Sequence, residues 1–220
     1  MNLDELKRNY YLFDPVSFGR IFVFVDFGNV RPWAKEFWPE ENKYRICIEI
    51  DIKKLAEFCD LVRPAEKFFY YGFFSDDAVP PGSRNENVRH KNSIYRIDKA
   101  RKSGFSVRSK EIKMIPHYDE DGKFLGKTPK CNFDVEIALD AMRKFEQYDT
   151  VMLFSGDSDF GKLLGYLKSK GKKIIVVSTR TRMSVELERV ADKFIPAETM
   201  KDLLRYDIKT NTPPPKGAEV

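Results

Sequence analysis

Two aspartates lie where a short apolar segment of the chain gives way to a helical pattern. The apolar segment covers 151–154 and is typical of a short buried strand. Asp157 and Asp159 follow it in a tight acidic turn, and a helix is expected over about 160–170. In open α/β sheets, ligands bind at the edge where strands end and helices begin. The two carboxylates are therefore candidates for a site at such an edge.

Two further aspartates occupy comparable places. Asp26 ends the unbroken apolar run 21–25, which indicates a strand buried on both faces. Asp134 lies in the first turn of a helix expected over 133–147. That helix follows a predicted hairpin, so it can start near the edge where the strands end. If the strands are parallel, Asp26 and Asp134 converge on the same edge as the acidic turn.

Several carboxylates at one place suggest a metal ion. They repel each other and raise each other's pKa values unless a cation compensates. Mg²⁺ and Mn²⁺ suit sites built only from oxygen ligands, and such a metal can activate water near neutral pH and neutralise a phosphodiester. A polyanionic substrate would also need basic side chains nearby. The candidates are Lys130, Arg180, Arg182 and a basic helix expected over about 84–103.

Each of these residues also has a simpler explanation. Asp159 alone fits the N-cap of the helix that begins at residue 160, and Asp134 fits an acid favoured by the helix dipole. Asp140 lies off the face of Asp134 and fits a salt bridge or a solvated acid. The basic helix is most simply a solvated face. Asp26 begins an Asp-Phe-Gly tripeptide, but no other kinase motif precedes it, so a kinase is discounted.

The elements that must position these residues alternate along the chain. Apolar strands separated by helices predict a parallel sheet covered on both faces, which is an α/β fold. Gly28, after the first strand, is able to take a positive φ. The remaining elements are strands at 67–74 and 172–178, helices at 51–62 and 184–192, a loop at 30–44, a hairpin at 105–128, an edge strand at 194–195 and a last helix at 198–204.

Length and composition favour one globular domain. The 220 residues include 18 Phe, and we expect a single domain over 1–206, with its core at about 20–196 and a flexible tail at 207–220. The net charge of +5, from 39 basic and 34 acidic residues, suits an acidic partner without requiring one. The three Cys lack zinc-ligand spacing. No signal-like or membrane-spanning run is found, so a cytoplasmic protein without membrane attachment is expected.

At these residues the chain resembles the NYN domain family, in the LabA-like branch of the PIN-like nuclease superfamily. Order and spacing agree over roughly 20–196. The matching residues are Phe24-Val-Asp26-Phe-Gly-Asn29, the segment Lys130-Cys-Asn-Phe-Asp134 with its helix, Ser155-Gly-Asp157-Ser-Asp159-Phe, and Ser184 through Phe194. The family's glycine after the middle lysine is absent here, which changes the expected local loop and leaves the carboxylate in place.

The resemblance implies a three-layer α/β/α PIN-like sandwich with a mainly parallel sheet and a β-hairpin insertion. It also implies RNA processing or RNA binding. In this family pattern, Asn29 would orient Asp26 or touch the substrate, and Ser155 and Ser184 would bind water or phosphate. The implied Mg²⁺ or Mn²⁺ ligands are Asp26, Asp134, Asp157 and Asp159.

The leading hypothesis is therefore a metal-dependent ribonuclease in which these four aspartates form the catalytic site. Lys130, Arg180 or Arg182 would neutralise the phosphate. The alternative is a non-catalytic RNA-binding or regulatory module with the same fold. A phosphatase or primase-type site is a third class, although its expected first-strand residues are absent. RNA versus DNA, endonuclease versus exonuclease action, one metal versus two, and monomer versus homodimer all stay open.

Overall fold

The centre of the molecule is a six-stranded sheet. The computed structural model describes residues 15–43, 48–75 and 84–207. All five strand pairings in this sheet are parallel, in the order β4-β3-β1-β7-β8-β9, which confirms the predicted α/β class. The strands are β1 (Ile21–Asp26), β3 (Glu66–Tyr70), β4 (Ser106–Arg108), β7 (Thr150–Phe154), β8 (Lys173–Ser178) and β9 (Lys193–Pro196).

The strand order places a topological switch point at the middle of the sheet. From β1 the chain builds β3 and β4 outward on one side, then crosses over and builds β7, β8 and β9 on the other. Renumbered in chain order, this is the 3-2-1-4-5-6 order of doubly wound folds, in which ligands bind at the carboxyl ends of the two strands where the direction reverses. Here those strands are β1 and β7.

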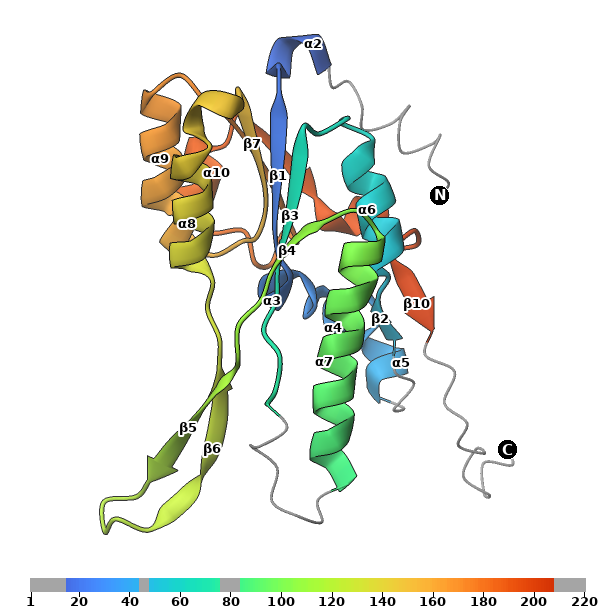
Figure 1. Cartoon of the computed structure of the whole chain (residues 1–220), viewed down its shortest axis with the longest axis vertical. Coiled ribbons are helices and arrows are strands. Elements are labelled where there is room, and N and C mark those ends of the chain that lie inside the picture. Colours follow the sequence, from blue (N-terminus) through green and yellow to red (C-terminus); the bar gives the residue numbers. More distant parts are fainter. Residues whose placement is uncertain (1–14, 44–47, 76–83, 208–220) are drawn as a thin grey trace.

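Side chains of each central strand alternate between two cores, one on each face of the sheet. In β1, Val23 and Val25 join one core, whereas Phe22 and Phe24 join the other. Helices cover both faces, as Figure 1 shows, so the predicted three-layer sandwich is confirmed. The first face carries α6 (Ile52–Asp60) and α7 (Arg84–Lys102), and the second carries α8 (Asp134–Arg143), α9 (Gly161–Ser169) and α10 (Val185–Val190).

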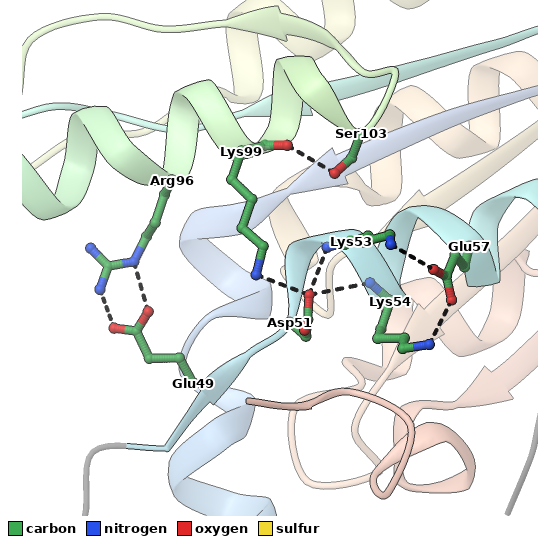
Figure 2. Close-up of polar contacts among 8 residues, drawn as sticks. All are labelled: Glu49, Asp51, Lys53, Lys54, Glu57, Arg96, Lys99 and Ser103. Atoms are coloured by element: carbon green, nitrogen blue, oxygen red, sulfur yellow. Dashed lines mark hydrogen bonds and ion pairs between the residues drawn. The ribbon is translucent and has the colours of Figure 1, made fainter. Parts of the chain in front are cut away.

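Ion pairs join helix α7 to the start of α6 and to β2 (Ile48–Ile50) (Figure 2). The Arg96 guanidinium pairs with Glu49 of β2. The Nζ of Lys99 lies 3.1 Å from a carboxylate oxygen of Asp51, which caps α6 by accepting from the backbone N–H of Lys53. The prediction that α7 is a solvated basic face is therefore wrong for two of its cations.

The segment predicted as a loop over 30–44 is helical in the part that the structure describes. Trp33 and Phe37 are buried, and a helical turn places both side chains on the core. Gly28 lies in the first of these helices and does not use the positive φ that is open to glycine. The helices are α3 (Phe27–Val30), α4 (Trp33–Phe37) and α5 (Pro39–Lys43), and α2 (Pro15–Phe18) precedes β1.

The chain beyond β9 also differs from the prediction of a single last helix over 198–204. A 3-10 helix, η3 (Ala197–Met200), is followed by β10 (Arg205–Asp207), which pairs antiparallel with β2. This pairing joins segments far apart in sequence, so a local pattern does not reveal it. The tail predicted over 207–220 lies outside the described residues except for Asp207. The other 3-10 helices are η1 (Phe145–Gln147), where α8 was expected to continue, and η2 (Ser158–Phe160).

The predicted hairpin is present, but it is shorter than 105–128 suggests. Strands β5 (Lys113–Tyr118) and β6 (Phe124–Lys130) form a separate antiparallel ribbon. The first part of the predicted segment instead forms β4, which joins the central sheet beside β3 while Phe105 is buried. In Figure 1 the ribbon and the first turns of α7 both project past the edge where β1 ends. Within the described ranges, no helix is long and apolar enough to cross a membrane.

Candidate functional site

Asp26 is the buried member of the acidic set. It ends β1 and caps α3, and its carboxylate is held by two hydrogen bonds. The backbone N–H of Gly28 donates to Oδ1 over 3.1 Å, and the side-chain amide of Asn29 donates to Oδ2 over 2.7 Å. The hydrogen bond from Asn29 is the contact that Asn29 needs in order to orient the Asp26 carboxylate.

The charge of Asp26 is costly in the metal-free protein. The pKa of Asp26 is raised from 3.8 to about 6, chiefly by burial and also by the nearby charge of Asp134, while the hydrogen bonds from Asn29 and Gly28 oppose both effects. Asp26 and Asp134 are therefore close enough for their charges to interact. A buried carboxylate with a second acid beside it favours a bound cation.

Asp134 begins α8 at the same edge. Its backbone N–H donates to the side-chain oxygen of Asn132 over 2.9 Å, and the Asn132 amide donates back to the Asp134 carboxylate over 2.6 Å. Burial raises the pKa of Asp134, and the charges of Asp157 and Asp159 raise it further. Asp134 therefore lies within electrostatic range of Asp26, Asp157 and Asp159.

Two residues near Asp134 were not singled out from the sequence. Asn132 holds the Asp134 carboxylate, and an Asn two residues before a helix-start acid is a recognisable turn pattern. Lys110 forms an ion pair with Glu136 of α8 at 2.5 Å, and its charge lowers the pKa of Asp134. Lys110 lies after β4, and only the folded chain brings it to α8.

The capping role predicted for Asp159 belongs to Asp157. The chain becomes helical at Ser158, two residues earlier than expected, so residue 157 is the extended residue before the first turn. The Oδ1 atom of Asp157 accepts from the backbone N–H of Asp159 over 3.1 Å. Asp159 itself is exposed to solvent, where its carboxylate can reach a cation or water.

The two serines predicted to bind water or phosphate support the turn around Asp157. The buried Ser155 accepts from the Asp157 N–H over 3.3 Å. Ser184 caps α10 by accepting from the Leu187 N–H over 3.3 Å, and its own N–H donates to Gly156 over 3.2 Å. The hydroxyl of Ser178, at the end of β8, is buried without a hydrogen-bond partner among the described residues.

The basic residues predicted to neutralise phosphate are placed less favourably for their predicted role than the aspartates are for theirs. Arg182 forms an ion pair with Glu36 of α4, and Thr181 donates to the same carboxylate over 2.6 Å. To act as the predicted phosphate ligand, Arg182 would therefore have to give up its contact with Glu36, which lies 146 positions away in the chain. Arg180 and Lys130 are exposed, and Arg180 donates its backbone N–H to Glu198 over 2.8 Å.

The donor set at this edge fits a hard divalent cation in its chemistry. All four aspartates offer carboxylate oxygens, and a carboxylate that already accepts one hydrogen bond per oxygen still has unused lone pairs. In the described part of the chain, no three carboxylates, thiols or imidazoles stand close enough to enclose a metal directly. A Mg²⁺ ion typically keeps several waters, so a looser set of carboxylates suits it.

Comparisons with known proteins agree with the resemblance seen in the sequence. A family profile described as NYN domain matches residues 20–202. The low amplitude and bright protein LabA of Synechococcus elongatus is 33% identical over 112 residues, which is 51% of this chain and 57% of the relative. The matched region thus spans little more than half the length of that relative.

The fold also occurs in a solved structure. A crystal structure of a protein of unknown function from Vibrio parahaemolyticus has a TM-score of 0.55 and 22% identity, over 86% of this chain and 96% of that chain. The T5 5′-exonuclease with bound zinc is a weaker match, with a TM-score of 0.40 and 12% identity over 71% of this chain and 55% of that chain. The weaker match carries no functional argument.

Proposed function

Because this chain belongs to the NYN domain family, within the PIN-like nuclease superfamily, we propose that it is a metal-dependent ribonuclease. The observation that carries the proposal is the interaction of Asp26 with Asp134, and of Asp134 with Asp157 and Asp159, at the carboxyl ends of β1 and β7. Both strands flank the switch point of the sheet, where doubly wound folds bind ligands. RNA as the substrate and a cytoplasmic location are part of the proposal.

Asp26, Asp134 and Asp157 would hold the metal, and the exposed Asp159 would join through water or a second metal. A bound Mg²⁺ or Mn²⁺ supplies charge neutralisation for the phosphodiester and a more acidic water. The chain's own contribution is orientation. Asn29 and Asn132 each hold one carboxylate by a side-chain hydrogen bond, at 2.7 Å and 2.6 Å. Fixed carboxylates cost little reorganisation when charge develops on the substrate.

Basic groups at the rim of the site would receive the phosphates. Lys130 and Arg180 are exposed and can move toward a polyanion. Arg182 would act indirectly, by positioning a loop. Its ion pair with Glu36 holds the loop that also contains Ser184. Lys110 offsets part of the negative charge at Asp134.

The alternative is an RNA-binding or regulatory module that keeps the acidic edge without catalysis. It is favoured by one observation: within the described ranges the acids do not already enclose a metal position. Titration calorimetry with Mn²⁺ separates the two proposals. Heat of binding that disappears on Asp26→Asn substitution supports the metal site, and no heat with the wild-type chain favours the alternative.

Substitution of Asp157 by Asn tests the catalytic proposal. We expect Mn²⁺-dependent cleavage of single-stranded RNA to fall by about 100-fold or more, because one anionic ligand is lost. Asn also caps helices well, so the bond to the Asp159 N–H and the fold should persist, as circular dichroism would verify. Asp121→Asn, on the exposed hairpin turn, is the matched control and should cleave normally. Full activity of Asp157→Asn would contradict the proposal.

A further inference from the structure

A groove leaves the acidic edge between α7 and the hairpin. A pocket of about 190 Å³ is lined by Gly28, two residues after Asp26, and by Phe133, directly before Asp134. A second pocket of about 420 Å³ is lined by residues of α7 and β6. We call the two together the α7–hairpin groove, because they share four lining residues: Arg31, Tyr71, Phe74 and Pro129.

Most of the residues that line the groove have no role in the nuclease proposal. Its residues come from the end of α3, the segment after β3, the helix α7 and the hairpin strand β6. Figure 1 shows α7 and the hairpin projecting past the carboxyl edge of the sheet, with the segment after β3 descending between them. The groove therefore leads outward from the candidate site.

The lining of this groove is basic. Arg31, Arg89 and Lys127 contribute cations, and no carboxylate among the described residues lines either pocket. Arg96 also lines the groove, but it is a buried residue. Its guanidinium pairs with Glu49, as Figure 2 shows. For Arg31 and Lys127, no carboxylate of the described chain serves as an ion-pair partner. Such a lining suits a string of phosphates, and it adjoins an edge that is itself acidic.

An aromatic ring stands among these cations. The ring of Phe74 is half-buried, with the Arg89 guanidinium 6.0 Å from its centroid. Its backbone is held on both sides by α7: its N–H donates to Ser93 over 3.3 Å, and its carbonyl contacts His90. Basic side chains together with an aromatic ring are a means by which proteins hold single-stranded nucleic acid.

We propose that the α7–hairpin groove binds a single strand of RNA and leads it to the acidic edge. Arg31, Arg89 and Lys127 contact successive phosphates, and one unpaired base stacks on Phe74. A base must be unpaired to stack on a side chain, so the groove selects single strands over duplexes. This inference rests on the proposed function, because that function makes the acidic edge the place where RNA is cleaved. Binding of RNA in the groove itself does not require cleavage.

Binding without cleavage is the measurement that isolates the groove. The full chain carrying Asp157→Asn, in EDTA, is titrated against a fluorescent single-stranded RNA of about twelve nucleotides, followed by anisotropy. Added singly, Arg31→Ala, Arg89→Ala and Lys127→Ala should each weaken binding by about 3- to 10-fold. Each should also reduce the dependence of log Kd on log salt by about 0.7, the value for one phosphate contact in a single strand.

Matched variants separate the groove from general charge and packing. Lys102→Ala removes one cation from the other end of α7, where the side chain pairs with Asp98 in solvent, and should leave binding unchanged. Phe74→Leu should weaken binding by about 5-fold or more, because bulk is kept and the ring is lost, whereas Phe74→Tyr should retain it. Circular dichroism verifies that each variant is folded.

The outcomes distinguish failure of the groove from failure of the nuclease. Unchanged binding by the Arg31, Arg89 and Lys127 variants would overturn the groove, as would a duplex of the same length that binds as tightly as the single strand. If the groove variants lose binding but the wild-type chain does not cleave RNA with Mn²⁺, the groove stands and the nuclease proposal fails. If the wild-type chain cleaves RNA while these variants bind RNA as tightly as the parent does, the nuclease proposal stands and the groove proposal fails.

Discussion

Asp26 has an unfavourable charge because its carboxyl group is buried at the end of β1. Its two hydrogen bonds, from Gly28 and Asn29, compensate only part of the cost of burial, since its pKa is still raised to about 6 from 3.8. At the scale of single residues, the charged Asp26 carboxylate in the candidate site therefore lowers the stability of the fold at neutral pH. Functional sites commonly carry such perturbed groups.

This cost predicts a pH dependence in the metal-free protein. A raised carboxyl pKa means that the contribution of Asp26 to stability is present below about pH 4 and is lost as pH rises through about 6. The loss is about 3 kcal/mol for a shift of roughly two pKa units. Asp26→Asn removes this titration, so urea unfolding in EDTA should show the variant gaining stability relative to wild type as pH rises from about 4 to about 7.5. Parallel pH profiles for the two proteins would contradict the assignment.

Gly156 is required by close packing beside Asp157. A Cβ atom at this position would overlap the carbonyl oxygen of Arg182 and the hydroxyl of Ser178. We expect Gly156→Ala to lower the free energy of unfolding by about 3 kcal/mol, because backbone atoms must move.

Gly165, within α9, is the matched control for Gly156. A Cβ there would meet nothing within 4 Å, so Gly165→Ala should be neutral or stabilise the protein by up to about 1 kcal/mol. Thermal and urea unfolding measure both variants. Equal stability of the two would refute the packing argument.

At the scale of elements, α8 carries Asp134 and is tied to the sheet by a buried carboxylate. Asp140 accepts from the Tyr70 hydroxyl of β3 and from the Arg108 guanidinium of β4, both over 2.9 Å. The salt bridge that the sequence suggested for this acid is confirmed. Because α8 is joined to two strands of the sheet, its first turn is positioned together with the end of β1.

The hairpin contributes little to the core. Most side chains of β5 and β6 are exposed, and an isolated two-stranded ribbon is only marginally stable in water. Replacing residues 115–128 by Asn-Gly should therefore change the free energy of unfolding by no more than about 1 kcal/mol. Binding of single-stranded RNA should weaken, because Lys127 is removed. Cooperative unfolding and anisotropy test both statements, and a large loss of stability would show that the ribbon supports the core.

At the scale of the whole molecule, stability is expected to decrease from the centre of the sheet outward. Every residue of β1 and β7 is buried, and both strands have parallel partners on each side. Hydrogen exchange should therefore be slowest in β1, β7 and β8, where opening requires global unfolding, and fastest in the hairpin. Exchange followed by mass spectrometry measures this order. A hairpin as protected as β1 would contradict it.

The amino-acid sequence by itself determined five of the six strands of the central sheet, all except β4, and the acids that follow β1 and β7. The apolar runs at 21–25 and 151–154 are short and continuous, which is the pattern of strands buried on both faces, and β1 and β7 form there. The parallel arrangement follows from the alternation of strands with helices, and it brings Asp26, Asp134 and Asp157 to one edge.

Only the tertiary structure decided how the side chains at this edge are used. The shift of the cap from Asp159 to Asp157 depends on where the first helical turn begins, which differs by one or two residues from what periodicity predicts. The pairing of Arg182 with Glu36, and of Arg96 with Glu49, joins residues 146 and 47 positions apart. The α7–hairpin groove likewise needs four separate segments of the chain. Contacts of this kind depend on the three-dimensional packing of elements, and no local pattern of residues encodes them.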